Sequence, residues 1–248
     1  KQYLKADKED ITTMKTNKNI LVVMPVEDEH KKTLEKHAKG SHFVYSSYDK
    51  VTPEMVKEAN IIIGNVDPFY LKEAENLEWL QLNSAGADPY VKKGVLPENV
   101  ILTNATGAYG PGVAEHMLAV LFSLQKKLHL YRDNQNQCQW QDEGAVMSLR
   151  GGTLLIVGLG DIGLYFARLM KNFGYRIIGI KRRLGQVPQD IDELHTMDDL
   201  DQLLPEADVV FSVLPDSKAT RNIYNKQRFK EMKNTAILLN AGRGSAVN

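Results

Sequence analysis

The stretch LLIVGLGDIG at residues 154–163 decides the fold of this chain. Four apolar residues are typical of a buried strand, and glycines follow at positions 158, 160 and 163. A strand, then Gly-x-Gly-x-x-Gly, then a helix is the setting of a dinucleotide-binding turn. The stretch therefore predicts a site for a nucleotide pyrophosphate.

Each glycine has a separate expected role. Gly158 permits the tight turn, Gly160 lets the backbone approach the pyrophosphate, and Gly163 lets the helix pack close to the strand. The helix that begins near Asp161 would direct free N–H groups and its positive dipole end at the phosphates. Two alternatives remain open, a glycine-rich turn without a ligand and an S-adenosylmethionine site. The cofactor-binding residues predicted in this stretch are Gly158, Gly160, Asp161, Ile162 and Gly163.

The end of the following strand indicates which dinucleotide is bound. An NAD site usually has an acidic residue there, which holds the ribose 2′-hydroxyl. The position 18 residues after Gly163 is Lys181, and Arg182 and Arg183 follow it. Three cations would neutralise a 2′-phosphate, and an arginine can hold it with two parallel hydrogen bonds. The triplet predicts NADP in preference to NAD, with a solvent-exposed basic turn as the alternative.

Composition excludes several classes of function. The chain has 248 residues, with 31 Lys+Arg and 31 Asp+Glu, so its formal net charge is zero. This balance provides no field that would attract nucleic acid or an anionic membrane. The single cysteine, Cys138, excludes an internal disulfide framework and fits a reducing compartment. Because there is no signal peptide and no apolar run near the roughly 20 residues of a membrane span, we expect a cytoplasmic protein without a membrane partner.

Short apolar runs alternate with helical patterns along the chain, which is typical of parallel βαβ units. Five strands are expected before a Gly/Pro-rich segment at residues 106–112, and four more from residue 153 onward. An apolar helix at residues 113–124 should be buried. We therefore predict an α/β protein with two doubly wound parallel-sheet domains. The expected boundaries are a tail at 1–13, one domain at 14–105 and a second at 106–248.

Further motifs occur in order along the chain. They are Asn83-Ser84-Ala85-Gly86-Ala87-Asp88, Val113-Ala114-Glu115-His116, Leu214-Pro215 with Thr220 following, and Met232-Lys233 leading to Asn240-Ala241-Gly242-Arg243-Gly244. With these motifs the chain resembles the D-isomer-specific 2-hydroxyacid dehydrogenases, a family that includes hydroxypyruvate/glyoxylate reductases and phosphoglycerate dehydrogenases. The resemblance implies a flavodoxin-like substrate domain, a Rossmann dinucleotide-binding domain and a homodimer, with the C-terminal parts of both domains missing here.

The resemblance also implies roles for particular residues. Arg243 would be catalytic, since an arginine just past a central strand faces the ligand crevice, where its planar fork can hold a carboxylate and polarise a ketone. Glu115 and His116 would form a buried structural pair. The substrate loop would be Ser84, Ala85, Gly86 and Ala87, whose N–H groups suit a carboxylate; a plain βα turn is the alternative. The remaining cofactor-binding residues would be Leu214, Pro215, Ala241 and Gly242.

We expect an enzyme that transfers a hydride between NAD(P)H and a small 2-oxo acid such as glyoxylate or hydroxypyruvate. In the family, the proton donor is a histidine held by a glutamate, and both lie downstream of the arginine motif. The chain ends five residues after Arg243, so neither is expected in it. A phosphoglycerate dehydrogenase-like enzyme and a non-catalytic, NAD(P)-sensing corepressor-type protein remain alternatives. The histidines lack ligand spacing, so no metal site is predicted.

Overall fold

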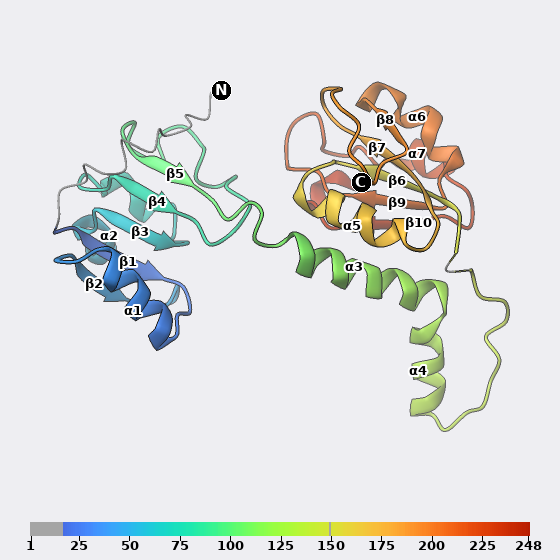
Figure 1. Ribbon diagram of the computed structural model, residues 1–248, viewed down its shortest axis with the longest axis horizontal. Coiled ribbons are helices and arrows are strands. Elements are labelled where there is room, and N and C mark those ends of the chain that lie inside the picture. Colours follow the sequence, from blue (N-terminus) through green and yellow to red (C-terminus); the bar gives the residue numbers. More distant parts are fainter. Residues whose placement is uncertain (1–16, 149) are drawn as a thin grey trace. The chain divides into compact units, whose positions relative to one another are not determined.

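The computed structural model describes residues 17–148 and 150–248. The chain divides into two compact units, one ending at Thr106 and the other spanning Gly107–Asn248. Each unit contains a five-stranded sheet (Figure 1). The tail predicted at residues 1–13 lies outside the described residues.

The sheet of the first unit is entirely parallel, in the order β2-β1-β3-β4-β5. This is the flavodoxin-like order, in which the direction of winding reverses between β1 and β3. The strands are β1 (Asn19–Val23), β2 (His42–Tyr45), β3 (Ile61–Gly64), β4 (Trp79–Gln81) and β5 (Ile101–Thr103). The helices are α1 (Asp28–His37), α2 (Pro53–Glu58) and the 3-10 helix η2 (Tyr70–Glu73). The predicted fold of this unit is confirmed.

Strand β1 shows why the first unit is built in layers. Its residues Ile20, Leu21, Val22 and Val23 are each at most 4% exposed. Leu21 and Val23 pack into the cluster on one face of the sheet, and Ile20 and Val22 into the cluster on the other. An apolar run without polar alternation is typical of a parallel strand that is covered on both faces.

The sheet of the second unit has the order β10-β9-β6-β7-β8 and is also entirely parallel. Counted along this unit from β6, the order is that of a Rossmann fold, with the reversal between β6 and β9. The second doubly wound domain is therefore confirmed. The strands are β6 (Thr153–Val157), β7 (Arg176–Ile180), β8 (Glu193–His195), β9 (Val209–Ser212) and β10 (Ile237–Asn240). The helices are α3 (Gly110–Gln125), α4 (Leu128–Asn136), α5 (Asp161–Lys171), α6 (Leu200–Leu203), α7 (Lys226–Glu231) and the 3-10 helices η3 (Met197–Asp199), η4 (Leu204–Glu206) and η5 (Gly244–Ala246).

The sequence prediction did not include strand β8 and helix α4, nor the short helices α6 and α7. Strand β8 is three residues long and has one apolar residue, so it carries no apolar run; among the described strands it pairs with β7 alone. Helix α4 follows Lys127, which has a φ of 54°, and none of its residues is buried. Neither element has the hydrophobic periodicity by which a strand or helix is predicted.

Helix α3 is only partly buried, so the expectation of a buried helix at residues 113–124 is wrong. Only Gly110, Ala114, Leu121 and Gln125 are buried, at spacings of four, seven and four residues, which place them in a stripe on one face of the helix. This stripe faces α5, against which α3 packs (Figure 1). Glu115 and His116 lie off the stripe and are exposed, so the prediction of a buried pair is wrong. Apolar composition alone does not tell how much of a helix surface its own domain covers.

Candidate functional site

Two glycines of the turn after β6 are required by packing within the protein. Gly158 has a φ of +110°, and a Cβ there would lie 2.6 Å from the Val213 carbonyl oxygen. A Cβ on Gly163 would lie 2.5 Å from the Gly158 carbonyl oxygen. The strand-to-helix turn can therefore close only without these side chains.

Gly160 differs from its two neighbours in the motif. It is the N-cap of α5, its φ of −98° is open to any residue, and a Cβ there would meet nothing within 4 Å. Among the described residues, the N–H groups of Asp161 and Ile162 donate no hydrogen bond within the chain. Unused N–H groups at a helix N-terminus, beside bare backbone, form a cradle that fits a pyrophosphate. The site therefore fits the dinucleotide that the sequence predicts.

The basic triplet lies beside this cradle. The register pairs Val157 with Ile180, and Gly158 N donates to the Ile180 carbonyl oxygen at 3.1 Å, so the ends of β6 and β7 are adjacent. Lys181, Arg182 and Arg183 follow Ile180 and are all exposed. Within the part of the chain that the structure describes, none of the three forms an ion pair with a carboxylate. The positive charge of the triplet is therefore not neutralised by neighbouring acids.

The loops after β9 and β10 meet at the same edge of the sheet. Ala241 N donates to the Ser212 carbonyl oxygen at 2.9 Å. A Cβ on Gly242 would lie 2.6 Å from both the N and the O of Leu214, so the two main chains are in direct contact. Contact with Leu214 thus explains the glycine at 242 without a ligand. Leu214 is 8% exposed, and Pro215 after it is exposed at the edge.

Arg243 follows this contact directly. It is half-buried and is the N-cap residue of η5. Asn240 holds the turn at both ends: its Oδ1 accepts from Gly242 N at 3.1 Å, and its Nδ2 donates to the Arg243 carbonyl oxygen at 2.9 Å. The backbone that carries the guanidinium is therefore fixed to the end of β10.

Sequence reasoning missed a charged cluster beside Arg243. Asp216 Oδ1 and Oδ2 accept from Arg221 Nε at 2.9 Å and Nη2 at 2.8 Å. Ser245 Oγ donates to Asp216 Oδ1 at 2.9 Å. The Arg221 and then the Ser245 hydrogen bonds lower the pKa of Asp216 to about 2, and the charges of Arg221 and Arg243 add to this effect. The available signal was an acidic residue directly after Leu214-Pro215.

In the first unit, the loop Ser84–Ala87 has its carbonyl oxygens occupied and its N–H groups unused. The four carbonyl oxygens accept from Ala105 N, Asn104 Nδ2, Ser84 Oγ and the N–H groups of Tyr90 and Val91. Over residues 17–148 and 150–248, the four N–H groups of this loop donate to no group of the chain. Successive unused N–H groups form a concavity suited to an anion.

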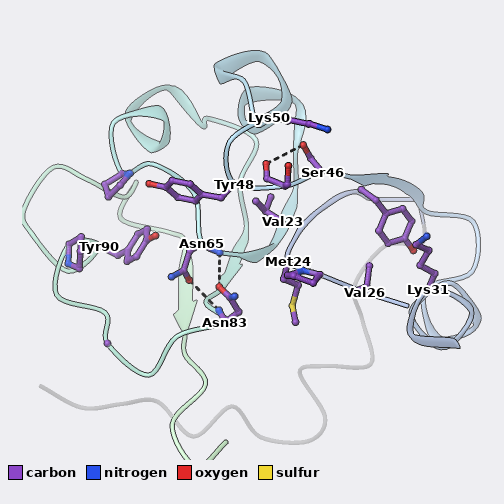
Figure 2. Close-up of a pocket in the computed structure, with 16 residues that line it drawn as sticks. Val23, Met24, Val26, Lys31, Ser46, Tyr48, Lys50, Asn65, Asn83 and Tyr90 are labelled. Atoms are coloured by element: carbon purple, nitrogen blue, oxygen red, sulfur yellow. Dashed lines mark hydrogen bonds between the residues drawn. The ribbon is translucent and has the colours of Figure 1, made fainter. Parts of the chain in front are cut away.

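A pocket of about 1060 Å³ lies next to this loop, at the carboxyl ends of β1, β2 and β3 (Figure 2). Asn65 and Asn83 brace its floor, since each backbone N donates to the other's Oδ1, at 3.0 and 3.2 Å. Tyr48 is 62% exposed, whereas Tyr90 is buried and donates to the Val66 carbonyl oxygen at 2.8 Å. Burial raises the pKa of Tyr90 to about 12. The sequence motifs located Gly86 in this region but neither Asn65 nor Tyr48, which belong to no recognisable motif.

The described residues contain no group of three or more His, Cys, Asp or Glu side chains arranged to hold a metal ion. Among the described helices, none combines the length and apolarity needed to cross a bilayer.

The carboxyl edge of the second sheet thus combines a pyrophosphate cradle, a basic triplet and an anchored arginine, which defines a dinucleotide-binding protein. Residues 118–248, more than half of the chain, match the model of the D-isomer-specific 2-hydroxyacid dehydrogenase NAD-binding domain. The chain belongs to this family.

Individual relatives agree with this assignment. A curated protein of Corynebacterium melassecola, encoded in the region 3′ of proB, is 30% identical over 201 residues, which are 79% of this chain and 65% of that protein. Glyoxylate/hydroxypyruvate reductase B of Yersinia pestis (strain Pestoides F) is 27% identical over 225 residues, 84% of this chain and 68% of that enzyme. The chain thus spans about two thirds of the length of these relatives.

Two solved structures show the same fold. A family protein from Aeromonas salmonicida subsp. salmonicida A449 is 31% identical, with a TM-score of 0.82 over 93% of this chain and 74% of that one. D-Lactate dehydrogenase from Aquifex aeolicus, solved with NAD and lactic acid, is 25% identical, with a TM-score of 0.74 over 93% of this chain and 70% of that one.

Proposed function

We propose that the full-length protein is an NAD(P)H-dependent reductase of small 2-oxo acids, such as glyoxylate or hydroxypyruvate. The observation that carries the proposal is the turn at Gly160. A Cβ there would meet nothing within 4 Å, and the N–H groups of Asp161 and Ile162 donate no hydrogen bond among the described residues. The exposed cations at 181–183 lie beside this turn. The family assignment supports the reaction class. When bound, the nicotinamide supplies or accepts the hydride.

The chain's own residues provide binding and polarisation. Arg243 holds the carboxylate of the 2-oxo acid and polarises its ketone, because a planar guanidinium offers parallel donors to both oxygens. In the first unit, the unused N–H groups of residues 84–87 suit a carboxylate, and we propose this loop as the substrate-binding loop. Leu214, Pro215, Ala241 and Gly242 line the cofactor. In this proposal the domain at 14–105 binds substrate, the domain at 106–248 binds cofactor, and the protein is a homodimer, as is usual in the family.

We also propose that NADP is preferred over NAD. Lys181, Arg182 and Arg183 are exposed at the end of β7, where an acid would otherwise hold the ribose 2′-hydroxyl. Fluorescence titration of the full-length protein should give a lower Kd for NADPH than for NADH. Replacing both arginines (Arg182→Ala with Arg183→Ala) should weaken NADPH binding roughly tenfold or more and leave NADH binding within about twofold. Equal affinities for the two cofactors before mutation would contradict the preference.

Turnover with a panel of 2-oxo acids tests the reaction itself. Glyoxylate and hydroxypyruvate should be reduced, whereas turnover of phosphohydroxypyruvate in preference to both would favour the phosphoglycerate dehydrogenase alternative. Arg243→Ala should lower kcat/KM by at least about 10²-fold, on the order of the loss of one preorganised donor, and spare NADPH binding. Cofactor binding without turnover of any acid would favour the sensor alternative.

A further inference from the structure

An acidic side chain belongs to the residue that begins the cofactor cradle. Asp161 is the first residue of α5, and its N–H group is one of the two that donate no hydrogen bond within the described part of the chain. A pyrophosphate at this helix N-terminus and the Asp161 carboxylate are both anions, so they repel each other and compete for the same N–H groups. The direction in which this side chain points therefore matters for cofactor binding.

The structure gives the Asp161 carboxylate a place against the first residue of α3, which packs on α5 within the second unit. A Cβ built on Gly110 would lie 2.5 Å from Asp161 Oδ2 and 2.7 Å from its Cγ. The carboxylate thus occupies the space that a side chain at position 110 would fill. The N-terminus of α3, a helix of 16 residues, is also the positive end of its dipole, which favours a negative charge there.

Tyr165 closes the same space from the next turn of α5. Its Cδ2 would lie 2.5 Å from a Cβ at position 110, and it is four residues after Asp161, on the same face of the helix. Gly110 does not have a positive φ, so its backbone conformation is open to other residues. The contact with α5, rather than the conformation, therefore leaves no room for a side chain at position 110.

We propose that Gly110 is a positioning residue for cofactor binding, whose bare Cα lets the Asp161 carboxylate lie against α3 and away from the pyrophosphate. With a side chain at position 110, this carboxylate turns toward the free N–H groups of α5, where it competes with a phosphate oxygen. The inference rests on the dinucleotide site of the proposed function.

The experiment is a fluorescence titration of the full-length protein with NADPH. Gly110→Ala should raise the Kd roughly tenfold, because a carboxylate turned into the cradle repels the pyrophosphate. Since salt screens this repulsion, the ratio of the variant Kd to the wild-type Kd should fall at about 1 M NaCl, where the Debye length is about 3 Å. In an Asp161→Ala background the same change should alter the Kd by less than about threefold, since no carboxylate remains.

The matched control is Gly112→Ala, the same change two residues further along α3. A Cβ at position 112 would meet nothing within 4 Å, so the Kd for NADPH should stay within about twofold. Urea unfolding shows whether either variant has lost its fold. If Gly110→Ala does not fold, Asp161→Glu takes its place: the space beside Gly110 does not admit a longer side chain, so Asp161→Glu should raise the Kd more than Asp161→Gln, which has the same shape without the charge.

An unchanged Kd in Gly110→Ala would overturn the proposal. A rise that does not depend on salt and persists in the Asp161→Ala background would also overturn it, because Gly110 would then only support the packing of α3. Equal Kd values for Asp161→Glu and Asp161→Gln would count against it in the same way. A wild-type protein that binds neither NADPH nor NADH would instead refute the proposed function.

Discussion

The three glycines after β6 obey different constraints at the scale of single atoms. At Gly158 and Gly163, a Cβ would meet backbone oxygens at 2.6 and 2.5 Å, so the fold itself forbids a side chain. At Gly160 the space is open and φ is −98°, so the fold permits one. The chain's own packing therefore does not explain the glycine at 160, whereas a bound pyrophosphate would.

Gly160→Ala and Gly163→Ala separate these two constraints. The methyl group of Gly160→Ala would project into the cradle, so we expect NADPH binding to weaken at least about tenfold, with a change in the free energy of unfolding of less than about 0.5 kcal/mol. Gly163→Ala should instead destabilise the protein by about 2 kcal/mol or more, because the backbone of the turn must move. NADPH titration and urea unfolding measure both effects. Tight NADPH binding by Gly160→Ala would exclude the cradle as the pyrophosphate site.

At the scale of elements, a backbone N–H group at or near the start of two strands of the second unit donates to an aspartate carboxylate. Asp208 Oδ2 accepts from Thr153 N at the start of β6, and Asp192 Oδ2 accepts from Ile177 N near the start of β7, both at 2.8 Å. Lys233 Nζ lies 2.7 Å from the other oxygen of Asp208. Burial raises the pKa of Asp208, but the hydrogen bonds from Lys233 and Thr153 outweigh it, so the pKa is lowered.

This lowered pKa predicts a pH-dependent contribution to stability. A carboxylate with a depressed pKa in the folded state stabilises it above the unfolded pKa of about 3.9, and this stabilisation is lost as the pH falls through the folded pKa. Asp208→Asn should therefore lower the free energy of unfolding by about 1 kcal/mol at pH 7, and by less at pH 3. Urea unfolding at both pH values measures the difference, and Asp190→Asn, whose pair with Arg168 is longer at 3.4 Å, is the control. A loss that is equal at both pH values would contradict this account.

At the scale of the whole molecule, each unit has its own parallel sheet and its own reversal of winding, between β1 and β3 in the first and between β6 and β9 in the second. Ligands of open α/β sheets bind at the carboxyl edge near such a reversal. The pocket beside Asn65 and the cradle at Gly160 both lie at these edges. In the proposed function the first unit binds substrate and the second binds cofactor, so all of the predicted cofactor contacts lie in the second unit.

This assignment of cofactor to the second unit predicts which backbone amides exchange more slowly when cofactor binds. Adding saturating NADPH to the full-length protein should slow amide exchange at residues 158–163 and 181–183, since a ligand that binds the folded state suppresses local opening at its site. Strands β1 and β3 of the first unit should exchange at an unchanged rate. Hydrogen–deuterium exchange with mass spectrometry measures both. Protection confined to the first unit would contradict the assignment of the two domains.

Most of the fold and part of the candidate site were determined by the sequence alone. The runs 154–157 and 177–180 contain no polar side chain, and such runs, like the spacing of Gly158, Gly160 and Gly163, are local signals. Local patterns predict buried strands and tight turns because the backbone imposes their periodicity directly. They did not identify β8 and α4, which have no apolar run, or the short helices α6 and α7. They also overestimated the burial of α3, whose apolar surface its own unit covers only in part.

Only the tertiary structure decided which polar groups meet. Asn65 and Asn83 are 18 residues apart, and Asp216 and Ser245 are 29 apart, yet each pair is joined by hydrogen bonds at the carboxyl edge of its sheet. The structure also separated the glycines that packing requires from the one that it leaves free. Such contacts depend on which strands become neighbours and in which register, and a single segment of sequence does not contain that information.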